Sequence, residues 1–316
     1  MLQQNQDPYA HSPVELFEIA QDGRALRFKV RSATGEAAIV REVLCTSYYR
    51  SACCLVGEGS VVIDVGAHIG SFTVAAAARG ARVLALEPVP ANYALLMENI
   101  QLNGLQARVK AFNMAVWSSA GERKMPVADD STGGSGFYYF KETVPEILVR
   151  CVRLGELMDA EGLTTCDLLK LDCEGAEFEI LSMLNLAAWQ RIKAIVAEYH
   201  LFAGYTLDQL TNLLIAHGFL VATQPEGVVG YLLAARPPTE PLLLRPLDVT
   251  LAESPLTRLP VIGPLWRTMR RPVHQLVVYY LNQVIVAQNR QQEQTYLYLS
   301  LLSQQAVWSR NSPNES

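Results

Sequence analysis

The residues with the clearest chemical potential lie where short apolar runs end. Residues 61–65 (VVIDV) are rich in β-branched side chains, which is typical of a strand buried on both faces, and they carry Asp64. The pattern D-x-G-x-x-x-G continues through Gly66 and Gly70 into a segment of helical character. Glycine allows a close approach of the backbone to a ligand, and a helix N-terminus offers unpaired N–H groups. Because open α/β sheets bind ligands at the carboxyl ends of their strands, this element predicts a ligand site.

A second acid follows the next apolar run. Glu87 lies 23 residues after Asp64, where an acid can accept hydrogen bonds from ribose hydroxyls. The sequence contains neither G-x-G-x-x-G nor G-x-x-x-x-G-K-[ST], which disfavours nicotinamide, flavin and nucleoside triphosphate ligands. The combination of strand, acid, glycine turn, helix, strand and Glu87 predicts an adenosyl ligand.

Two later apolar runs end in acids and a histidine. Asp172 ends one of them and is expected to face the cleft, whereas Glu177 either joins it there or stabilises a helix N-terminus. Glu198 and His200 alternate, so their side chains share one face of a strand. His200 titrates near neutral pH and could take a proton from a hydroxyl; the alternative is a surface histidine. We assign no metal ligand, although a divalent cation among Asp172, Glu198 and His200 stays open.

Strands and helices must alternate for these residues to meet. Apolar periodicity predicts strands at 61–65, 81–86, 107–115, 168–172, 194–198, 218–223 and 228–234, and helices at 70–79, 91–102, 176–186 and 207–217. This alternation predicts an α/β fold with a mostly parallel, doubly wound sheet, whose last two strands form an antiparallel hairpin at one edge. Residues 118–150 include STGGSG and FYYF, which indicates a flexible loop, either disordered or covering the substrate.

Composition divides the chain into four parts. Residues 1–59 are expected to form an extension of a β-hairpin, turning at Asp22–Gly23, and a helix at 38–56. Residues 60–235 form the ligand-binding domain. Residues 236–272 are proline-rich and indicate a linker, and residues 273–316 indicate a helical tail.

The tail has three alternative roles. Residues 255–316 hold six arginines, no lysine and two glutamates, so this part is positively charged although the whole chain has a net charge of −5. The helical tail could pack on its own domain or pair with a second copy to give a homo-oligomer. The arginines with Trp266 also suit peripheral contact with a membrane or a glycan-assembly partner.

The overall composition excludes several classes of protein. A net charge of −5 argues against a nucleic-acid partner, because phosphate binding needs a basic face. No apolar run reaches the roughly 20 residues that span a bilayer, and the first twenty residues lack a basic segment followed by an apolar one. The six cysteines form no C-x-x-C pattern. We therefore expect a cytoplasmic protein with reduced thiols.

Five segments together resemble the FkbM-type family of S-adenosylmethionine-dependent methyltransferases. They are VIDVGAHIG at 62–70, LEP at 86–88, NYALLMENIQLNG at 92–104, AVW at 115–117 and KLDCEGAE at 170–177. The resemblance covers roughly residues 60–235, with His68 where the family usually has Asn. It implies a Rossmann-like class I methyltransferase with a seven-stranded sheet. It also implies S-adenosylmethionine as cofactor and transfer of its methyl group to a hydroxyl, of a sugar in a polysaccharide or glycolipid or of a natural product.

The resemblance also implies roles for individual residues. The cofactor is expected to contact Asp64, Gly66, His68, Gly70, Glu87, Asn92, Asn113, Val116 and Asp172. The acceptor side is expected to hold Asp172, Glu198 and His200, with Asp172 or His200 as general base. The acceptor itself is a small molecule or a glycan. Two rivals remain: a non-catalytic methyltransferase-like scaffold acting through its C-terminal helix, and a nicotinamide-dependent oxidoreductase.

Overall fold

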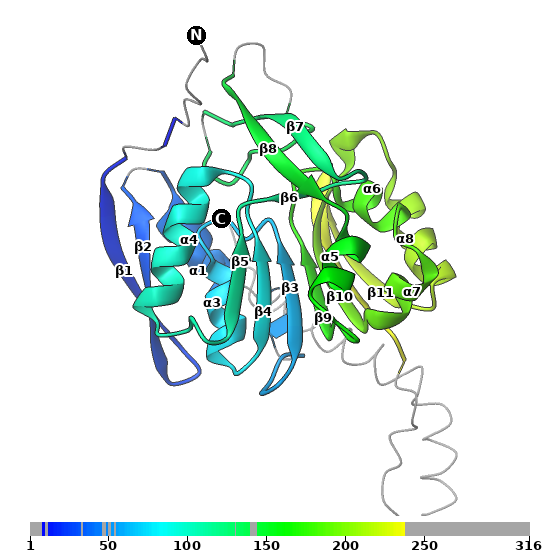
Figure 1. The fold of residues 1–316 in the computed structure, drawn as a ribbon, viewed down its shortest axis with the longest axis horizontal. Helices are drawn as coiled ribbons and strands as arrows, with labels where there is room; N and C mark the ends of the chain where they lie inside the picture. Colours follow the sequence, from blue (N-terminus) through cyan, green and yellow to red (C-terminus); the bar gives the residue numbers. More distant parts are fainter. Residues whose placement is uncertain are drawn as a thin grey trace, which may run out of the picture. The chain divides into compact units, whose positions relative to one another are not determined.

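The computed structural model describes residues 8–9, 12–32, 34–45, 49, 52–53, 55–129, 131–139 and 144–237 (Figure 1). The chain divides into two units, Met1–Arg236 and Pro237–Ser316, and every element named below belongs to the first. The predicted linker beyond residue 237 and the predicted tail at 273–316 lie outside the described residues. In the described part of the chain, no helix is long and apolar enough to cross a membrane.

A seven-stranded sheet forms the centre of the first unit. Its order is β11 (Leu220–Glu226), β12 (Val229–Ala235), β10 (Ala194–His200), β9 (Leu168–Leu171), β3 (Val61–Val65), β4 (Arg82–Leu86) and β5 (Val109–Phe112). β12 is antiparallel to both neighbours, and the other adjacent pairs are parallel. This confirms the predicted doubly wound α/β sheet of a class I methyltransferase, with the terminal hairpin at one edge.

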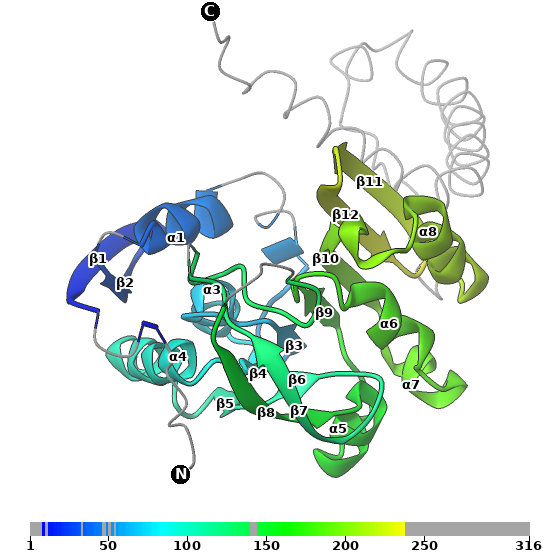
Figure 2. The ribbon, with the colours of Figure 1, turned by 90° about the horizontal axis from the view of Figure 1, so that it is seen from above.

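Helices cover both faces of the sheet, which explains why its strands are almost continuously apolar. One face packs against α5 (Leu154–Ala160), α6 (Glu177–Ser182), α7 (Leu186–Arg191) and α8 (Leu207–Ala216). The other face meets α4 (Pro90–Leu102), with α3 (Ser71–Ala78) beside it (Figure 2). The helix predicted at 176–186 is in fact two short helices, because Asn185 caps α7 by accepting a hydrogen bond from the Ala188 N–H at 2.8 Å.

Residues 118–150 differ most from expectation. The predicted flexible loop contains β7 (Gly121–Pro126) and β8 (Glu146–Val152), which pair antiparallel in a second sheet with β6 (Ala115–Val116). β8 alternates buried and exposed positions, and this period of two was the signal in the sequence. The strand predicted at 107–115 divides into β5 and β6, because the chain leaves the central sheet after Phe112.

The N-terminal extension packs on the helices of the central unit. β1 (Val14–Gln21) and β2 (Arg24–Arg31) pair around Asp22 and Gly23, whose φ angles of 50° and 77° confirm the predicted tight hairpin. The helix α1 (Glu36–Cys45) covers the first part of the helix predicted at 38–56. Tyr49, Ala52 and Cys53 are also helical, and residues 46–48, 50–51 and 54 lie outside the described residues. β2 lies against α3 and α4, and α1 lies against α3 (Figure 2).

Asn99 of α4 and Asn103, which caps the C-terminus of that helix, bind the free edge of β2 as a neighbouring strand would. Asn99 accepts from the Lys29 N–H at 2.6 Å and donates to the Lys29 carbonyl at 3.2 Å and the Ile69 carbonyl at 2.8 Å. Asn103, one helical turn later, exchanges the same pair of bonds with Arg27 at 3.0 and 2.7 Å. Each amide supplies both a donor and an acceptor, so the edge of β2 is satisfied without another strand.

Replacing Asn99 with Leu should therefore destabilise the protein. The side chain is fully buried, and its loss leaves backbone groups of Lys29 and Ile69 without partners. We expect the free energy of unfolding to fall by about 2–4 kcal/mol in chemical denaturation. Gln101→Leu, on the exposed side of the same helix, is the control and should change it by less than about 0.5 kcal/mol. Equal effects of the two substitutions would contradict this account.

Candidate active site

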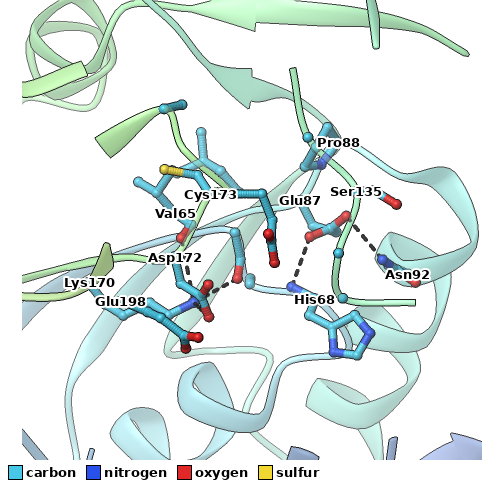
Figure 3. A pocket seen from close by; sticks show the side chains of 18 of the residues that line it. Val65, His68, Glu87, Pro88, Asn92, Ser135, Lys170, Asp172, Cys173 and Glu198 are labelled. Carbon is cyan, nitrogen blue, oxygen red and sulfur yellow. Dashed lines mark hydrogen bonds and ion pairs between the residues drawn. The ribbon is translucent and has the colours of Figure 1, made fainter. Parts of the chain in front are cut away.

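A cavity lies at the carboxyl ends of β3, β4, β9 and β10 (Figure 3). Residues 131–136, here called the cavity loop, line it from one side, and α1 with Tyr49 lines it from the N-terminal extension. The predicted site residues that line it are Gly66, His68, Glu87, Asn92, Val116, Asp172 and Glu198. Four others do not line it: Asp64, Gly70, Asn113 and His200. The sequence therefore indicated the region of the cavity, but it did not distinguish the residues that line the cavity from those that support the lining residues.

Beneath the cavity, the ammonium of Lys170 joins two strands. Its Nζ lies 3.2 Å from Asp64 Oδ1 and 3.4 Å from Asp172 Oδ2, and it donates to the Gly66 carbonyl at 2.7 Å. Burial alone would lower the pKa of Lys170, but the charges of Asp64 and Asp172 raise it above its ordinary value. Lys170 was missed in the sequence, although a lysine inside the apolar run LLKL is itself a signal.

Asp64 supports the site from below. It is fully buried, and its second oxygen accepts from Thr73 Oγ1 at 2.6 Å. This carboxylate faces Lys170 and Thr73 and acts on the cavity through the lysine, whereas its predicted contact with the cofactor stays a prediction.

The glycines of the turn make room for protein atoms. Gly66 has a φ of 76°, and a Cβ there would lie 1.7 Å from the backbone oxygen of Asp172. Gly70 has a φ of 92°, and a Cβ there would lie 2.6 Å from Leu96 Cδ1. Both positions require glycine for conformation and space. Gly70 allows close packing on α4, whereas Gly66 also borders the cavity.

Glu87 is held at the end of β4 by amides. Its Oε2 accepts from the His68 N–H at 2.8 Å, and its Oε1 accepts from the Val89 N–H at 2.9 Å and Asn92 Nδ2 at 3.4 Å (Figure 3). Burial raises the pKa of Glu87, while these hydrogen bonds and His68 act in the opposite direction. Asn113 does not line the cavity; its side chain donates to the carbonyls of Glu87 and Pro88 at 2.9 and 3.0 Å and fixes the turn behind them.

A cluster of carboxylates surrounds His200. Its Nδ1 lies 3.1 Å from Glu177 Oε1, and its Nε2 lies 3.5 Å from Glu174 Oε2 and 3.9 Å from Glu198 Oε1. Burial alone would lower the pKa of His200, but the Glu177 hydrogen bond and the surrounding acids raise it to about 9. The imidazole is 3% exposed and does not line the cavity, and a role for His200 as general base stays a prediction.

Glu177 organises the turn that carries these acids. It is fully buried and accepts from the N–H groups of Cys173 and Gly175, each at 3.1 Å, and from the Tyr205 hydroxyl at 2.9 Å. Its role is therefore to hold the turn and His200 together, and it does not line the cavity.

Two carboxyls on the β9 and β10 side of the cavity, Glu174 and Glu198, have raised pKa values. Burial, and next the charge of Asp172, raise the pKa of Glu198 to about 8. Burial raises that of Glu174 to about 7 although His200 opposes this. The hydroxyl of Tyr49 lies 3.3 Å from both Asp172 Oδ2 and Glu198 Oε2. Nothing in the sequence indicated Tyr49, because its contact with Asp172 spans 123 residues.

Some of these residues could also hold a metal ion. Asp172, Glu174 and His200 each offer a ligand atom, and these atoms lie within 4.8 Å of one another. The set differs from the predicted alternative by having Glu174 in place of Glu198. A divalent cation at this set would compete with the proton on His200, because a histidine ligand must be deprotonated.

Substituting His200 with Gln should change how stability depends on pH. The folded-state pKa of about 9 exceeds the value of 6.5 expected for an unfolded histidine, so the folded protein holds an extra proton between them. The stabilisation from His200 is therefore fully present below about pH 6.5 and lost as the pH rises through 9. Urea unfolding across this range should show the difference between wild type and variant shrinking with pH. A constant difference would contradict the raised pKa.

Comparison with known proteins fits this geometry. A family model described as "Methyltransferase FkbM domain" matches residues 64–221. The 31-O-demethyl-FK506 methyltransferase FkbM of Streptomyces tacrolimicus is 32% identical over 199 residues, which cover 53% of this chain and 75% of that protein. Methyltransferase sdnD of Sordaria araneosa is 29% identical over 172 residues, covering 43% and 65%.

Among solved structures, magnesium protoporphyrin IX methyltransferase from Synechocystis with bound SAM is 13% identical. The match covers 64% of this chain and 80% of that one at a TM-score of 0.38, so the fold rests on the sheet topology alone. The family match spans β3 to β11, the part of the chain that carries Glu87, Asp172 and Glu198. The chain belongs to the FkbM methyltransferase domain family and is an S-adenosylmethionine-dependent methyltransferase.

Proposed function

We propose that this protein transfers a methyl group from S-adenosylmethionine to a hydroxyl oxygen of a natural product, or of a sugar in a polysaccharide or glycolipid. The observation that carries the proposal is the separation of two kinds of carboxylate around one cavity. Glu87 is fixed by amides after the end of β4, whereas Asp172 follows β9 and Glu198 lies in the neighbouring strand β10. The Streptomyces relative is named for an O-linked position, which supports oxygen as the accepting atom.

The residues on the β3 and β4 side suit the nucleoside. Glu87 lines the cavity, and its lone pairs suit the ribose hydroxyls. Ser71 begins α3 and lines the cavity, and its buried hydroxyl has no hydrogen-bond partner among the described residues. That hydroxyl and the helix N-terminus suit the polar groups of the methionine part. Met114, Ala115 and Val116 supply an apolar border for the base.

The residues on the β9 and β10 side suit removal of a proton. S-adenosylmethionine supplies an already activated methyl group, so the protein must align the acceptor and take its hydroxyl proton. Asp172 lines the cavity with 27% of its side chain exposed, and Lys170 holds it from below. We assign the proton to the pair of Asp172 and Glu198, which Tyr49 bridges. Because the two carboxyls lie close together, a proton held by one of them leaves the other as the proton acceptor near neutral pH.

Two substitutions separate cofactor binding from catalysis. Asp172→Asn should lower the rate of methyl transfer at least about 100-fold and leave the dissociation constant of S-adenosylhomocysteine nearly unchanged. Glu87→Gln should instead raise that constant several-fold, because an amide nitrogen cannot replace the accepting oxygen. Titration calorimetry and transfer of a labelled methyl group to a panel of hydroxylated natural products and glycans measure both.

The control for these substitutions is Asp208→Asn at an exposed position in α8, which should change neither value. If the wild-type protein bound neither S-adenosylmethionine nor S-adenosylhomocysteine, the proposed function would be wrong. Binding with no transfer to any acceptor would favour the scaffold.

The rate should also rise with pH. Glu174 and Glu198, with pKa values of about 7 and 8, lose their protons as the pH increases, and a carboxylate accepts a proton only when ionised. We expect the pH profile of the transfer step to increase between about pH 6 and pH 9. In Glu198→Gln the increase should move to lower pH, because the group that titrates highest is gone. A profile that is flat in the wild type would refute the assignment.

A further inference from the structure

A buried polar network connects the N-terminal extension to the cavity. Its residues come from four separate parts of the chain, and each is at least partly buried: Arg31, Glu36, His68, Glu87, Asn92 and Thr132. Burying so many polar groups costs free energy unless they are paired. The proposed mechanism of methyl transfer does not use Arg31, Glu36 or Thr132, so the burial of these three polar residues needs a separate explanation.

His68 joins the nucleoside carboxylate to the cavity loop. Its backbone N–H donates to Glu87, and its Nε2 lies 3.0 Å from Thr132 Oγ1. The residue has a φ of 53°, a left-handed conformation that is uncommon outside glycine. One strained residue therefore fixes the positions of Glu87 and Thr132 at once.

Asn92 makes a second link between the same parts. Its Nδ2 donates to the Thr132 carbonyl at 2.9 Å and lies 3.4 Å from Glu87 Oε1, so the loop is held by both its side chain and its backbone. Its Oδ1 accepts from Arg31 Nη2 at 2.5 Å. Figure 3 shows His68 and Asn92 both joined to Glu87.

Two charged residues of the N-terminal extension, Arg31 and Glu36, contact Asn92 and His68. Glu36, the first residue of α1, is fully buried; it accepts from the Arg31 N–H at 2.6 Å, and its Oε1 lies 3.5 Å from His68 Nε2. Arg31, at the end of β2, is 3% exposed and lies 3.4 Å from the same oxygen. The ionised Glu36 thus fixes the ring of His68, while Arg31 fixes the amide of Asn92.

The loop that these residues hold extends across the cavity. Gly133 lies close to Ile39 of α1, since a Cβ there would be 3.8 Å from Ile39 Cδ1. At the other end, a Cβ on Gly136 would lie 2.7 Å from the Cβ of Glu174. The cavity loop therefore reaches from the nucleoside side to the acids of the acceptor side.

We propose that Glu36 and Arg31 of the N-terminal extension are positioning residues for methyl transfer, which act through His68 and Asn92 to hold Thr132 and the cavity loop over the nucleoside side of the cavity. This inference rests on the proposed function for its binding readout. It places the extension within the working part of the enzyme, although no residue of the network from that extension lines the cavity.

Hydrogen exchange of the ligand-free full chain tests the mechanical part without any cofactor. Glu36→Gln should increase exchange in the peptide covering residues 131–136, although Glu36 is far from it in sequence. Thr132→Val should do the same while leaving α1 unchanged. A purely local role for Glu36 predicts faster exchange in β2 and α1 only, and that result would overturn the proposal. Arg31→Lys keeps the charge but loses the donor to Asn92, and it serves the same test if Glu36→Gln does not fold.

Binding of S-adenosylhomocysteine by calorimetry tests the functional part. Glu36→Gln and Thr132→Val should each raise its dissociation constant about 10-fold, and the double variant should be little worse than either alone, because both break one link. Additive losses would overturn the link through His68.

The controls are matched in chemistry. Glu98→Gln removes an exposed ion pair with Lys29, also between the extension and α4, and should have no effect. Thr165→Val removes a buried hydroxyl that has no partner among the described residues. Absence of binding by the wild type would refute the proposed function, whereas normal wild-type binding with unaffected variants would refute only this inference.

Discussion

The active site depends on one buried ammonium group. Lys170 stands between Asp64 and Asp172 and also binds the Gly66 carbonyl, so it joins the glycine turn after β3 to the acid that ends β9. A buried charge without an ionic partner would cost several kcal/mol, and removing the lysine would leave Asp64 with only the Thr73 hydroxyl. The absence of a side chain at Gly66 lets the two strand ends approach closely enough for this contact. The position of Asp172 at the cavity follows from these two constraints.

Charge is divided unequally around the cavity. On the nucleoside side a single carboxylate, Glu87, is matched by amide donors. On the acceptor side, Asp172, Glu174 and Glu198 crowd together, with Lys170 and His200 as the nearby cations. Crowding and burial raise the pKa values of Glu174 and Glu198 toward neutrality. The same acids hold His200 protonated, and its charge limits how far those carboxyls are destabilised.

Much of this architecture could be predicted from the sequence because it is encoded locally. The apolar runs before Asp64, Glu87 and Asp172 specify buried parallel strands, and parallel strands bring their carboxyl ends to one edge. The sequence could not show which of these side chains face the cavity. Asp64 lies inside β3, paired with Ala85, whereas Glu87 follows the end of β4, so only Glu87 reaches the cavity and Asp64 contacts Lys170 below it. Tyr49 and Thr132 carried no motif, since their partners are distant in sequence.

The N-terminal extension shows why domain boundaries drawn from composition can separate parts that work together. The hairpin has little core of its own, and Leu26, Phe28 and Val30 become buried only because β2 lies on α3 and α4. Asn99 and Asn103 bind backbone groups on one edge of β2, and a slip of one residue would turn those groups away from α4. Register in turn determines where Arg31 and Glu36 enter the core, beside His68 and Asn92. A slip of two residues would keep the apolar side chains of β2 on its buried face, but it would remove Arg31 and Glu36 from Asn92 and His68, so the extension and the cavity must assemble in one arrangement.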